Sequence, residues 1–159
     1  MIVKKLEWYN EEATKLFAMA LARSPLIGQA YIELIGELGS GKTTFVRHLF
    51  QALGVIERVK SPTYAVVESY RLPNLDIWHF DFYRFDDPQE WEDAGFRDIF
   101  STSGLKISEW PENAQGFLPT ADLMIKISFI TETSRSVTIQ ENTALGSDLI
   151  SPLMLNSNE

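Results

Sequence analysis

The 159-residue chain contains no cysteine. Disulfide bonds and thiolate metal sites are therefore excluded, and the lack of cysteine is compatible with a reducing compartment. No apolar run approaches the roughly 18 residues of a membrane-spanning helix, and the N-terminus lacks the apolar core and small-residue cleavage site of a secretory signal. We therefore expect a cytoplasmic protein that does not associate with membranes.

Basic residues are also scarce. The chain has 14 Lys and Arg against 22 Asp and Glu, which gives a formal net charge of −8. Because affinity for a phosphate backbone comes mainly from clustered Lys and Arg, we expect no DNA binding and no tight RNA binding by this chain alone. The hydrophobic fraction of 45% and charged fraction of 23% are typical of folded globular proteins. The length fits one domain.

Hydrophobic periodicity predicts an α/β fold, with a central β-sheet flanked by helices and antiparallel hairpins. Strands are expected over residues 2–6, 30–35, 64–70, 77–83, 105–109, 123–130 and 135–140. Helices are expected over residues 11–23, 43–53, 87–94 and 96–100. The periodicity fades after Asn142, so we expect a domain over residues 1–142 and a loosely ordered C-terminal tail over residues 143–159.

The strongest motif is the run Gly36-Glu37-Leu38-Gly39-Ser40-Gly41-Lys42-Thr43. It fits GxxxxGKT and lies between an expected strand and an expected helix, which is the context that a P-loop requires. A chance match in a chain of this length has a probability of roughly one in a hundred, before the flanking elements are considered. The motif therefore predicts a small single-domain P-loop NTPase that binds ATP with Mg²⁺.

Each position of this loop suits a part of the nucleotide. Gly39 and Gly41 allow successive backbone N–H groups to curl around a phosphate without Cβ clashes, and the helix N-terminus favours negative charge. Lys42 would reach the β- and γ-phosphates. Thr43 would offer its hydroxyl to Mg²⁺, and Thr44 would contact the α-phosphate.

A P-loop also needs an acidic residue at a strand end to hold Mg²⁺ or its water ligands. Asp81 and Glu109 both follow short apolar runs, and the sequence does not decide which of them is the direct metal ligand. On a strand, His79 would face the same side as Asp81, so it could position a carboxylate or a water molecule. A solvated carboxylate at a strand end is the alternative interpretation for either acid.

The run Lys60-Ser61-Pro62-Thr63-Tyr64 joins the helix after the P-loop to the next strand. A hydroxyl in this loop could sense the γ-phosphate, as switch segments do. Without other observations, a simple proline turn would be the favoured interpretation.

Several motifs together resemble the bacterial tRNA threonylcarbamoyladenosine biosynthesis ATPase family, TsaE, formerly called YjeE. The resemblance extends to about residue 140 and is much more specific than the P-loop alone. It is carried by GELGSGKTTFVR at 36–47, VKSPTY at 59–64, HFDFYR at 79–84, GFRD at 95–98 and SEWPE at 108–112.

The resemblance implies that Thr43 and Glu109 ligate Mg²⁺ and that Asp81 supports the metal shell or the attacking water. It implies a switch-like loop over residues 61–64, including Thr63, and a position for Trp110 close to the nucleotide. It further implies that the N-terminal helix and the region of Glu112 border the nucleoside. Lys42, Asp81 and Glu109 would then be the catalytic residues.

The resemblance also implies partners and a process. TsaE-like proteins join TsaD and TsaB in the pathway that places threonylcarbamoyl on the adenosine beside the anticodon, and ATP hydrolysis would drive or reset that assembly. Contact with tRNA would be indirect, through the complex. Hydrolysis by the isolated chain would be slow, because no residue clearly supplies an arginine finger.

The main alternative is a small P-loop kinase that transfers phosphate to a metabolite, because it would use the same loop, Lys42 and Mg²⁺. Such enzymes often carry an arginine-bearing lid, whereas here the region after the P-loop helix reads as a β-hairpin. A GTPase is disfavoured because the sequence lacks an N/TKxD motif. An ABC-type ATPase is disfavoured because LSGGQ is absent.

Overall fold

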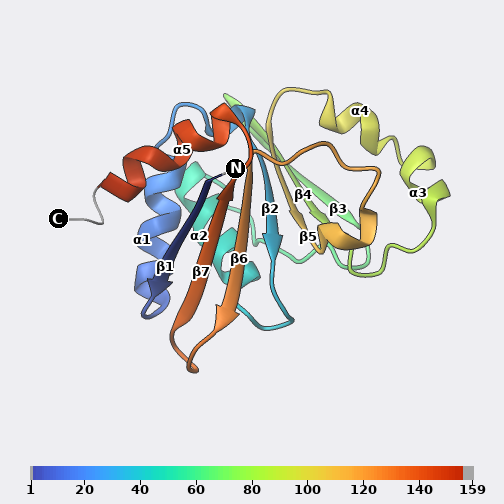
Figure 1. Cartoon of the computed structure of the whole chain (residues 1–159). Helices are drawn as coiled ribbons and strands as arrows, with labels where there is room; N and C mark the ends of the chain where they lie inside the picture. The colour runs from blue at the N-terminus through green and yellow to red at the C-terminus, as the bar shows by residue number, and fades with distance from the viewer. Residues whose placement is uncertain (1, 156–159) are drawn as a thin grey trace.

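A seven-stranded mixed sheet forms the centre of the computed structural model, which describes residues 2–155 (Figure 1). The strands are β1 (Ile2–Trp8), β2 (Tyr31–Ile35), β3 (Val67–Leu72), β4 (Leu75–Asp81), β5 (Leu105–Glu109), β6 (Leu123–Phe129) and β7 (Arg135–Glu141). Their order in the sheet is β1-β7-β6-β2-β5-β4-β3. The central strands β6, β2, β5 and β4 run parallel, whereas β1, β7 and β3 pair antiparallel with their neighbours. The parallel strands therefore end at one edge of the sheet.

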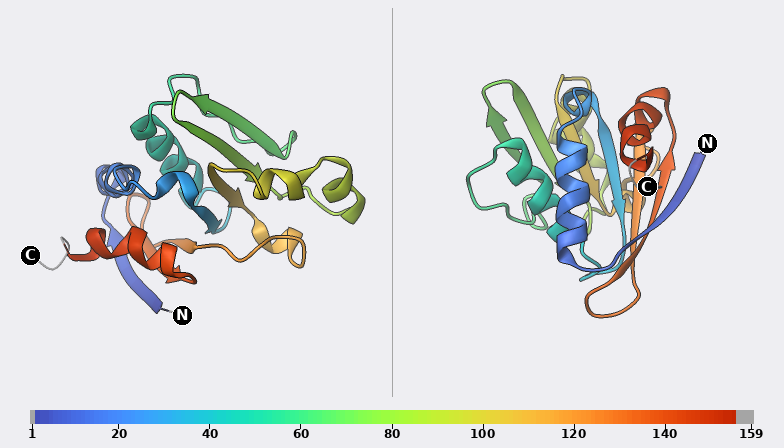
Figure 2. Two further views of the ribbon diagram at one scale, coloured as in Figure 1. Left: turned by 90° about the horizontal axis from the view of Figure 1, so that it is seen from above. Right: turned by 90° about the vertical axis from the view of Figure 1, so that its left-hand side faces the viewer.

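Helices cover both faces of this sheet (Figure 2). They are α1 (Glu11–Ala22), α2 (Lys42–Leu53), α3 (Pro88–Asp93), α4 (Phe96–Phe100) and α5 (Ala144–Leu155), with short 3-10 turns at Ile27–Gln29 and Pro111–Ala114. The helices α1 and α2 pack on one face, and α3 and α4 lie on the other. The predicted α/β architecture with flanking hairpins is confirmed.

The alternation of side chains along β4 divides the interior into two clusters. Ile77 faces the larger cluster beneath α1 and α2, whereas Phe80 faces an aromatic cluster beneath α3 and α4. The aromatic cluster is dense: the Phe80 ring stacks on Phe82 at 5.7 Å, and Trp91 lies 5.5 Å from Phe96, centroid to centroid. Because successive strand residues point to opposite faces, both clusters fix the carboxyl end of β4.

The first strand of the expected hairpin begins later than the sequence suggested. We expected a strand from residue 64, but β3 starts at Val67 and Tyr64 is 84% exposed. The backbone of Val66 has φ of +69°, a left-handed conformation outside the β region, and its N–H donates to the carbonyl of Pro62 at 2.6 Å. Residues 61–66 therefore form a turn beside the sheet edge.

The expectation of a loosely ordered tail is wrong for residues 144–155, which form α5; residues 156–159 of that expected tail lie outside the described residues. Leu149 and Ile150 of this helix are fully buried in the larger cluster. Thr143 starts the helix, because its hydroxyl accepts from the N–H of Gly146 at 3.1 Å and donates to Asp122 at 2.7 Å. Gly146 and Pro152, which usually interrupt helices, obscured the pattern in the sequence.

Throughout the described residues, each helix is too short or too polar to cross a lipid bilayer.

Candidate nucleotide-binding site

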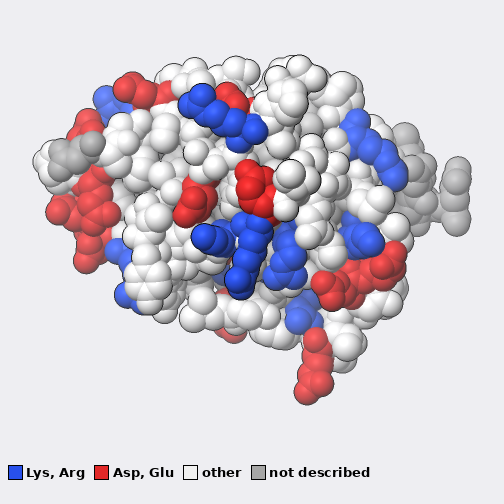
Figure 3. Space-filling view, turned by 180° about the vertical axis from the view of Figure 1, so that it is seen from behind, with Lys and Arg blue, Asp and Glu red and all other residues white. Residues whose placement is uncertain are grey.

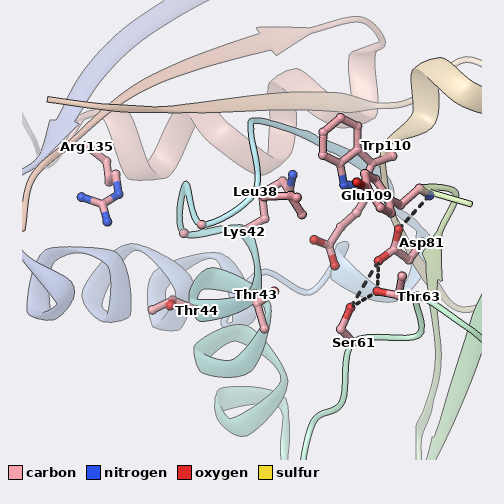
Figure 4. Close-up of a pocket in the computed structure, with 13 residues that line it drawn as sticks. Leu38, Lys42, Thr43, Thr44, Ser61, Thr63, Asp81, Glu109, Trp110 and Arg135 are labelled. Carbon is pink, nitrogen blue, oxygen red and sulfur yellow. Dashed lines mark hydrogen bonds between the residues drawn. The ribbon is translucent and has the colours of Figure 1, made fainter. Parts of the chain in front are cut away.

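The P-loop connects β2 to α2 at the edge where the parallel strands end (Figure 4). Gly41 has φ of +113°, a backbone conformation that residues with a Cβ rarely adopt. A Cβ on Gly36 would lie 2.6 Å from the carbonyl oxygen of Ile127. These two glycines are therefore required by the backbone itself, and the predicted strand, glycine-rich loop and helix are confirmed.

A cavity of about 250 Å³ lies over this loop. It collects most of the residues that the sequence predicted for the site, although they come from four separate segments of the chain. Its predicted members are Leu38, Gly39, Gly41, Lys42, Thr43, Thr44, Thr63, Asp81, Glu109 and Trp110. Ser61, Tyr83 and Arg135 complete the lining.

Lys42 supplies a buried cation to this cavity. Its side chain is 5% exposed, its Nζ donates to the carbonyl of Gly36, and it lies 4.3 Å from the centre of the Trp110 ring. Burial lowers the pKa of Lys42, and the nearby carboxylates, Glu109 foremost, oppose that shift. The amine thus faces a cavity bordered by acids, where a phosphate would add a further counter-charge.

Asp81 is held rigidly at the end of β4. Its Oδ2 accepts hydrogen bonds from the hydroxyls of Thr63 at 2.9 Å and Ser61 at 3.2 Å, and its Oδ1 accepts from the N–H of Tyr83 at 2.9 Å (Figure 4). These three hydrogen bonds fix the orientation of the carboxylate. They also tie the loop that contains Ser61 and Thr63 directly to the sheet.

Glu109 lies opposite Asp81 in the parallel pairing of β4 with β5. Its Oε2 is 2.6 Å from Nε2 of His79, and the histidine side chain is fully buried. Because a carboxylate only accepts, Nε2 carries the proton of this bond. Among the described residues, Oε1 of Glu109 has no hydrogen-bond partner, so one oxygen of this carboxylate is available to a ligand in the cavity.

Trp110 follows Glu109 in an unusual backbone conformation. Its φ is +54°, and within the described residues Val66 is the other non-glycine residue with positive φ. Both are adjacent to the cavity: Trp110 lines it, and the carbonyl of Val66 accepts from the N–H of Asp81 at 2.8 Å. Strained backbone of this kind gathers at ligand sites, where the surrounding structure enforces it.

Arg135 is a cavity residue that the sequence analysis missed. Its Nε donates to the carbonyl of Ser40 at 2.7 Å, and its guanidinium also donates to carbonyls of the turn between β6 and β7. The side chain therefore supports the P-loop backbone. No local signal marks it, because in the sequence Arg135 is simply the first residue of a strand 95 positions after Ser40.

Four predicted nucleotide contacts, Gly36, Glu37, Ser40 and Glu112, line an adjoining pocket of about 490 Å³ and not the P-loop cavity. The two spaces share Trp110. A third pocket, of about 250 Å³, lies beside Gly41 and Thr44, and its wall includes Asn10, the N-cap of α1, and Glu11, the first residue of that helix. The structure therefore places the start of α1 beside the P-loop and Glu112 in a different pocket, and their contact with the nucleoside stays a prediction.

The donor set of the cavity fits Mg²⁺ bound together with phosphates. Among the side chains that the structure describes, no cluster of three His, Asp or Glu residues is arranged to hold a metal ion. Mg²⁺ in a phosphate site does not need one, because one or two protein oxygens, phosphate oxygens and water complete its shell. The Thr43 hydroxyl, the unpaired oxygen of Glu109 and the Asp81 carboxylate provide such oxygens.

Comparisons with known proteins identify the family of the chain. The sequence model of the family described as "Threonylcarbamoyl adenosine biosynthesis protein TsaE" matches residues 8–137. The chain belongs to the TsaE family.

Two TsaE proteins illustrate the similarity. The Haemophilus influenzae protein is 40% identical over 137 residues, which cover 86% of each chain. The Bacillus subtilis protein is 34% identical over 146 residues, covering 91% of this chain and 89% of its own. Both are named tRNA threonylcarbamoyladenosine biosynthesis protein TsaE. Membership in the TsaE family associates the chain with this tRNA modification.

The fold is similar as well. The crystal structure of Bacillus subtilis YdiB superposes with a TM-score of 0.76 at 27% sequence identity, and the alignment covers 99% of both chains. That coverage includes the region of α5, beyond the residues matched by the TsaE sequence model.

Proposed function

We propose that this protein is a Mg²⁺-dependent ATPase of tRNA threonylcarbamoyladenosine biosynthesis, located in the cytoplasm. The observation that carries the proposal is the convergence of Lys42, Thr43, Asp81 and Glu109 on one cavity above the P-loop. Family membership supports the pathway, and the chemistry of the cavity supports the nucleotide.

In this proposal the loop binds the phosphates of ATP. Backbone N–H groups from residues 39–43 and the N-terminus of α2 would contact the β-phosphate, and Lys42 would exchange its bond to the Gly36 carbonyl for the β- and γ-phosphates. Thr44 would contact the α-phosphate. The pocket beside Asn10 and Glu11 would then receive the nucleoside, since it continues the cavity past Gly41 and Thr44.

Mg²⁺, when bound, would neutralise charge on the β- and γ-phosphates. Thr43 and the free oxygen of Glu109 would hold it, and His79 would fix the orientation of Glu109. Asp81, already oriented by three donors, would accept a hydrogen bond from the attacking water. Water adds to the γ-phosphorus, the bond to the β–γ bridging oxygen breaks, and ADP and phosphate are released.

We further propose that TsaD and TsaB are the partners and that hydrolysis drives or resets their complex. Arg135 donates hydrogen bonds to four backbone carbonyls. It therefore stabilises the P-loop and the β6–β7 turn and is not a free arginine finger. A residue contributed by a partner would therefore raise the slow rate of the isolated chain. Contact with tRNA would remain indirect, which accords with the net charge of −8.

The test is co-elution of the purified chain with TsaB and TsaD of the same organism, with and without Mg·ATP, while phosphate release is followed. We expect ATP-dependent assembly and faster phosphate release in the complex. Assembly without any phosphate release would reduce the function to nucleotide binding. If neither assembly nor stimulated release occurs, the tRNA-modification role is rejected, and phosphoryl transfer to metabolites becomes the function to test.

A further inference from the structure

A groove of about 860 Å³ adjoins the P-loop cavity and is lined by three cations. Arg47 projects from α2 one turn after Thr43, and Arg58 and Lys60 come from the loop that follows this helix. Thr43 and Ser61 line both the groove and the cavity. The side of the molecule opposite to the view of Figure 1 shows Lys and Arg side chains near its centre, with Asp and Glu side chains next to them (Figure 3).

These three cations have no ionic partner in the described part of the chain. Basic residues elsewhere on this acidic protein do form ion pairs, for example Arg97 with Glu92 at 3.0 Å. Arg47, Arg58 and Lys60 are nevertheless exposed and unpaired, and Glu57 is the acidic residue in the lining of the groove. A local excess of positive charge on a chain of net charge −8 favours an anionic ligand at this place.

The groove also presents an apolar side chain. Ile56, in the same loop, is 96% exposed, and Val59 beside it is half-buried. A phosphate backbone would leave Ile56 without a partner, and three cations would give RNA only weak, sequence-independent affinity. A peptide with acidic and aliphatic side chains satisfies both features, because carboxylates pair with the cations while an apolar side chain covers the isoleucine.

The loop that forms the groove leads directly into the nucleotide site. Residues 56–60 continue into Ser61 and Thr63, whose hydroxyls donate to Asp81. A ligand in the groove and a nucleotide in the cavity would therefore both order the same loop. Such coupling is reciprocal, so each would strengthen the binding of the other.

We propose that this groove docks an acidic segment of a partner protein and couples that docking to nucleotide binding. The inference rests on the proposed function, since it describes the chemistry of the partner that the ATPase engages. The docked segment contributes carboxylates to Arg47, Arg58 and Lys60 and an aliphatic side chain to Ile56.

The experiment compares Arg47→Gln/Arg58→Gln/Lys60→Gln with the control Lys5→Gln/Lys15→Gln/Arg23→Gln. Both triple variants lose three exposed positive charges, but the control residues lie on β1 and at α1, away from the groove. The dissociation constants for the TsaB–TsaD complex and for an unmodified tRNA transcript are measured with saturating Mg·ATP at two salt concentrations. We expect the groove variant to bind the complex about tenfold or more weakly, with a smaller salt dependence, and the control to bind like the wild type.

Equal affinity of the groove variant and the wild type for the complex overturns the docking proposal and leaves the proposed function intact. If the groove variant loses tRNA binding but retains the complex, the groove binds RNA, and the protein-docking proposal is overturned. If the wild type itself does not bind the complex, both the docking proposal and the tRNA-modification role fail, whereas its phosphate release still tests the ATPase activity separately.

Discussion

Nε2 of His79 lies 2.6 Å from Oε2 of Glu109, and this bond is buried directly beneath the P-loop cavity. The imidazole also packs edge-on against Phe50 at 5.7 Å, so its ring is held by the helix that follows the P-loop. The bond occupies one oxygen of Glu109 and leaves the other to face a ligand. The hydrogen bond to His79 therefore fixes the orientation of the Glu109 carboxylate.

Loss of this bond is expected to weaken Mg²⁺ binding. In His79→Leu, Glu109 loses its donor, and we expect the Mg²⁺ concentration that supports half-maximal ATP binding to rise by about 10- to 100-fold. His79→Gln keeps an N–H donor and should recover part of the loss. Lys5→Gln changes an exposed residue of β1 that lines neither the P-loop cavity nor the pocket beside Glu11, and it serves as the control. An unchanged Mg²⁺ requirement in His79→Leu would contradict a positioning role.

The two carboxylates of the site should differ in their effect on the metal. Both oxygens of Asp81 already accept protein hydrogen bonds, whereas Glu109 has a free oxygen. We therefore expect Glu109→Ala to reduce Mg²⁺-dependent ATP binding by about tenfold or more, and Asp81→Ala to reduce it less while lowering the hydrolysis rate. Titration of ATP at several Mg²⁺ concentrations measures the ranking. The reverse order would assign the direct metal ligand to Asp81.

Helix α5 should be part of the folded core. Leu149 is fully buried, so Leu149→Ala is expected to lower the free energy of unfolding by about 2–5 kcal/mol. Asp148→Ala changes the preceding exposed residue and should stay within about 0.5 kcal/mol of the wild type. Urea denaturation of both variants measures the difference. Similar urea midpoints for Leu149→Ala and Asp148→Ala would show that α5 does not stabilise the domain.

The partly buried carboxyl group of Glu33 is expected to make the stability of the protein depend on pH. Its burial raises its pKa, and the hydroxyl of Tyr31, which donates to Oε2 at 3.0 Å, opposes that shift only in part. The folded state thus favours the protonated acid. This contribution is complete below the unfolded-state pKa of about 4.3 and is lost as the pH rises through the raised pKa of the folded state.

Glu33→Gln, which stays neutral and can still accept from Tyr31, should therefore become more stable relative to the wild type as the pH rises from 4 to 8. Thermal unfolding across this range measures the difference. The control is Glu7→Gln, because Glu7 is an exposed residue of β1. A stability difference for Glu33→Gln that does not change with pH would show that burial does not perturb this carboxyl group.

The grouping of residues around the P-loop cavity was largely predictable because its sequence signals are local. The glycines, Lys42 and Thr43 lie within eight consecutive residues, and the short apolar runs before Asp81 and Glu109 indicated strand ends. Parallel pairing of β4 with β5 then brings these two acids together at one edge.

The remaining features depend on contacts between distant segments. The sequence placed His79 beside Asp81 on one face of a strand, but its partner is Glu109, 30 residues away. The contact of Arg135 with Ser40 spans 95 residues and has no pattern of its own. Helix α5 was missed for a different reason, because Gly146 and Pro152 oppose a helix locally while the burial of Leu149 and Ile150 stabilises it.

The central claim is that the P-loop cavity binds Mg·ATP for hydrolysis, and Lys42→Ala tests it most directly. Calorimetric titration with ATP, together with single-turnover phosphate release, should show wild-type binding that needs Mg²⁺, and a loss of about 10²-fold or more in turnover when the Lys42 amine is removed. Unchanged binding and phosphate release in Lys42→Ala would contradict the assignment of this cavity as the ATPase site.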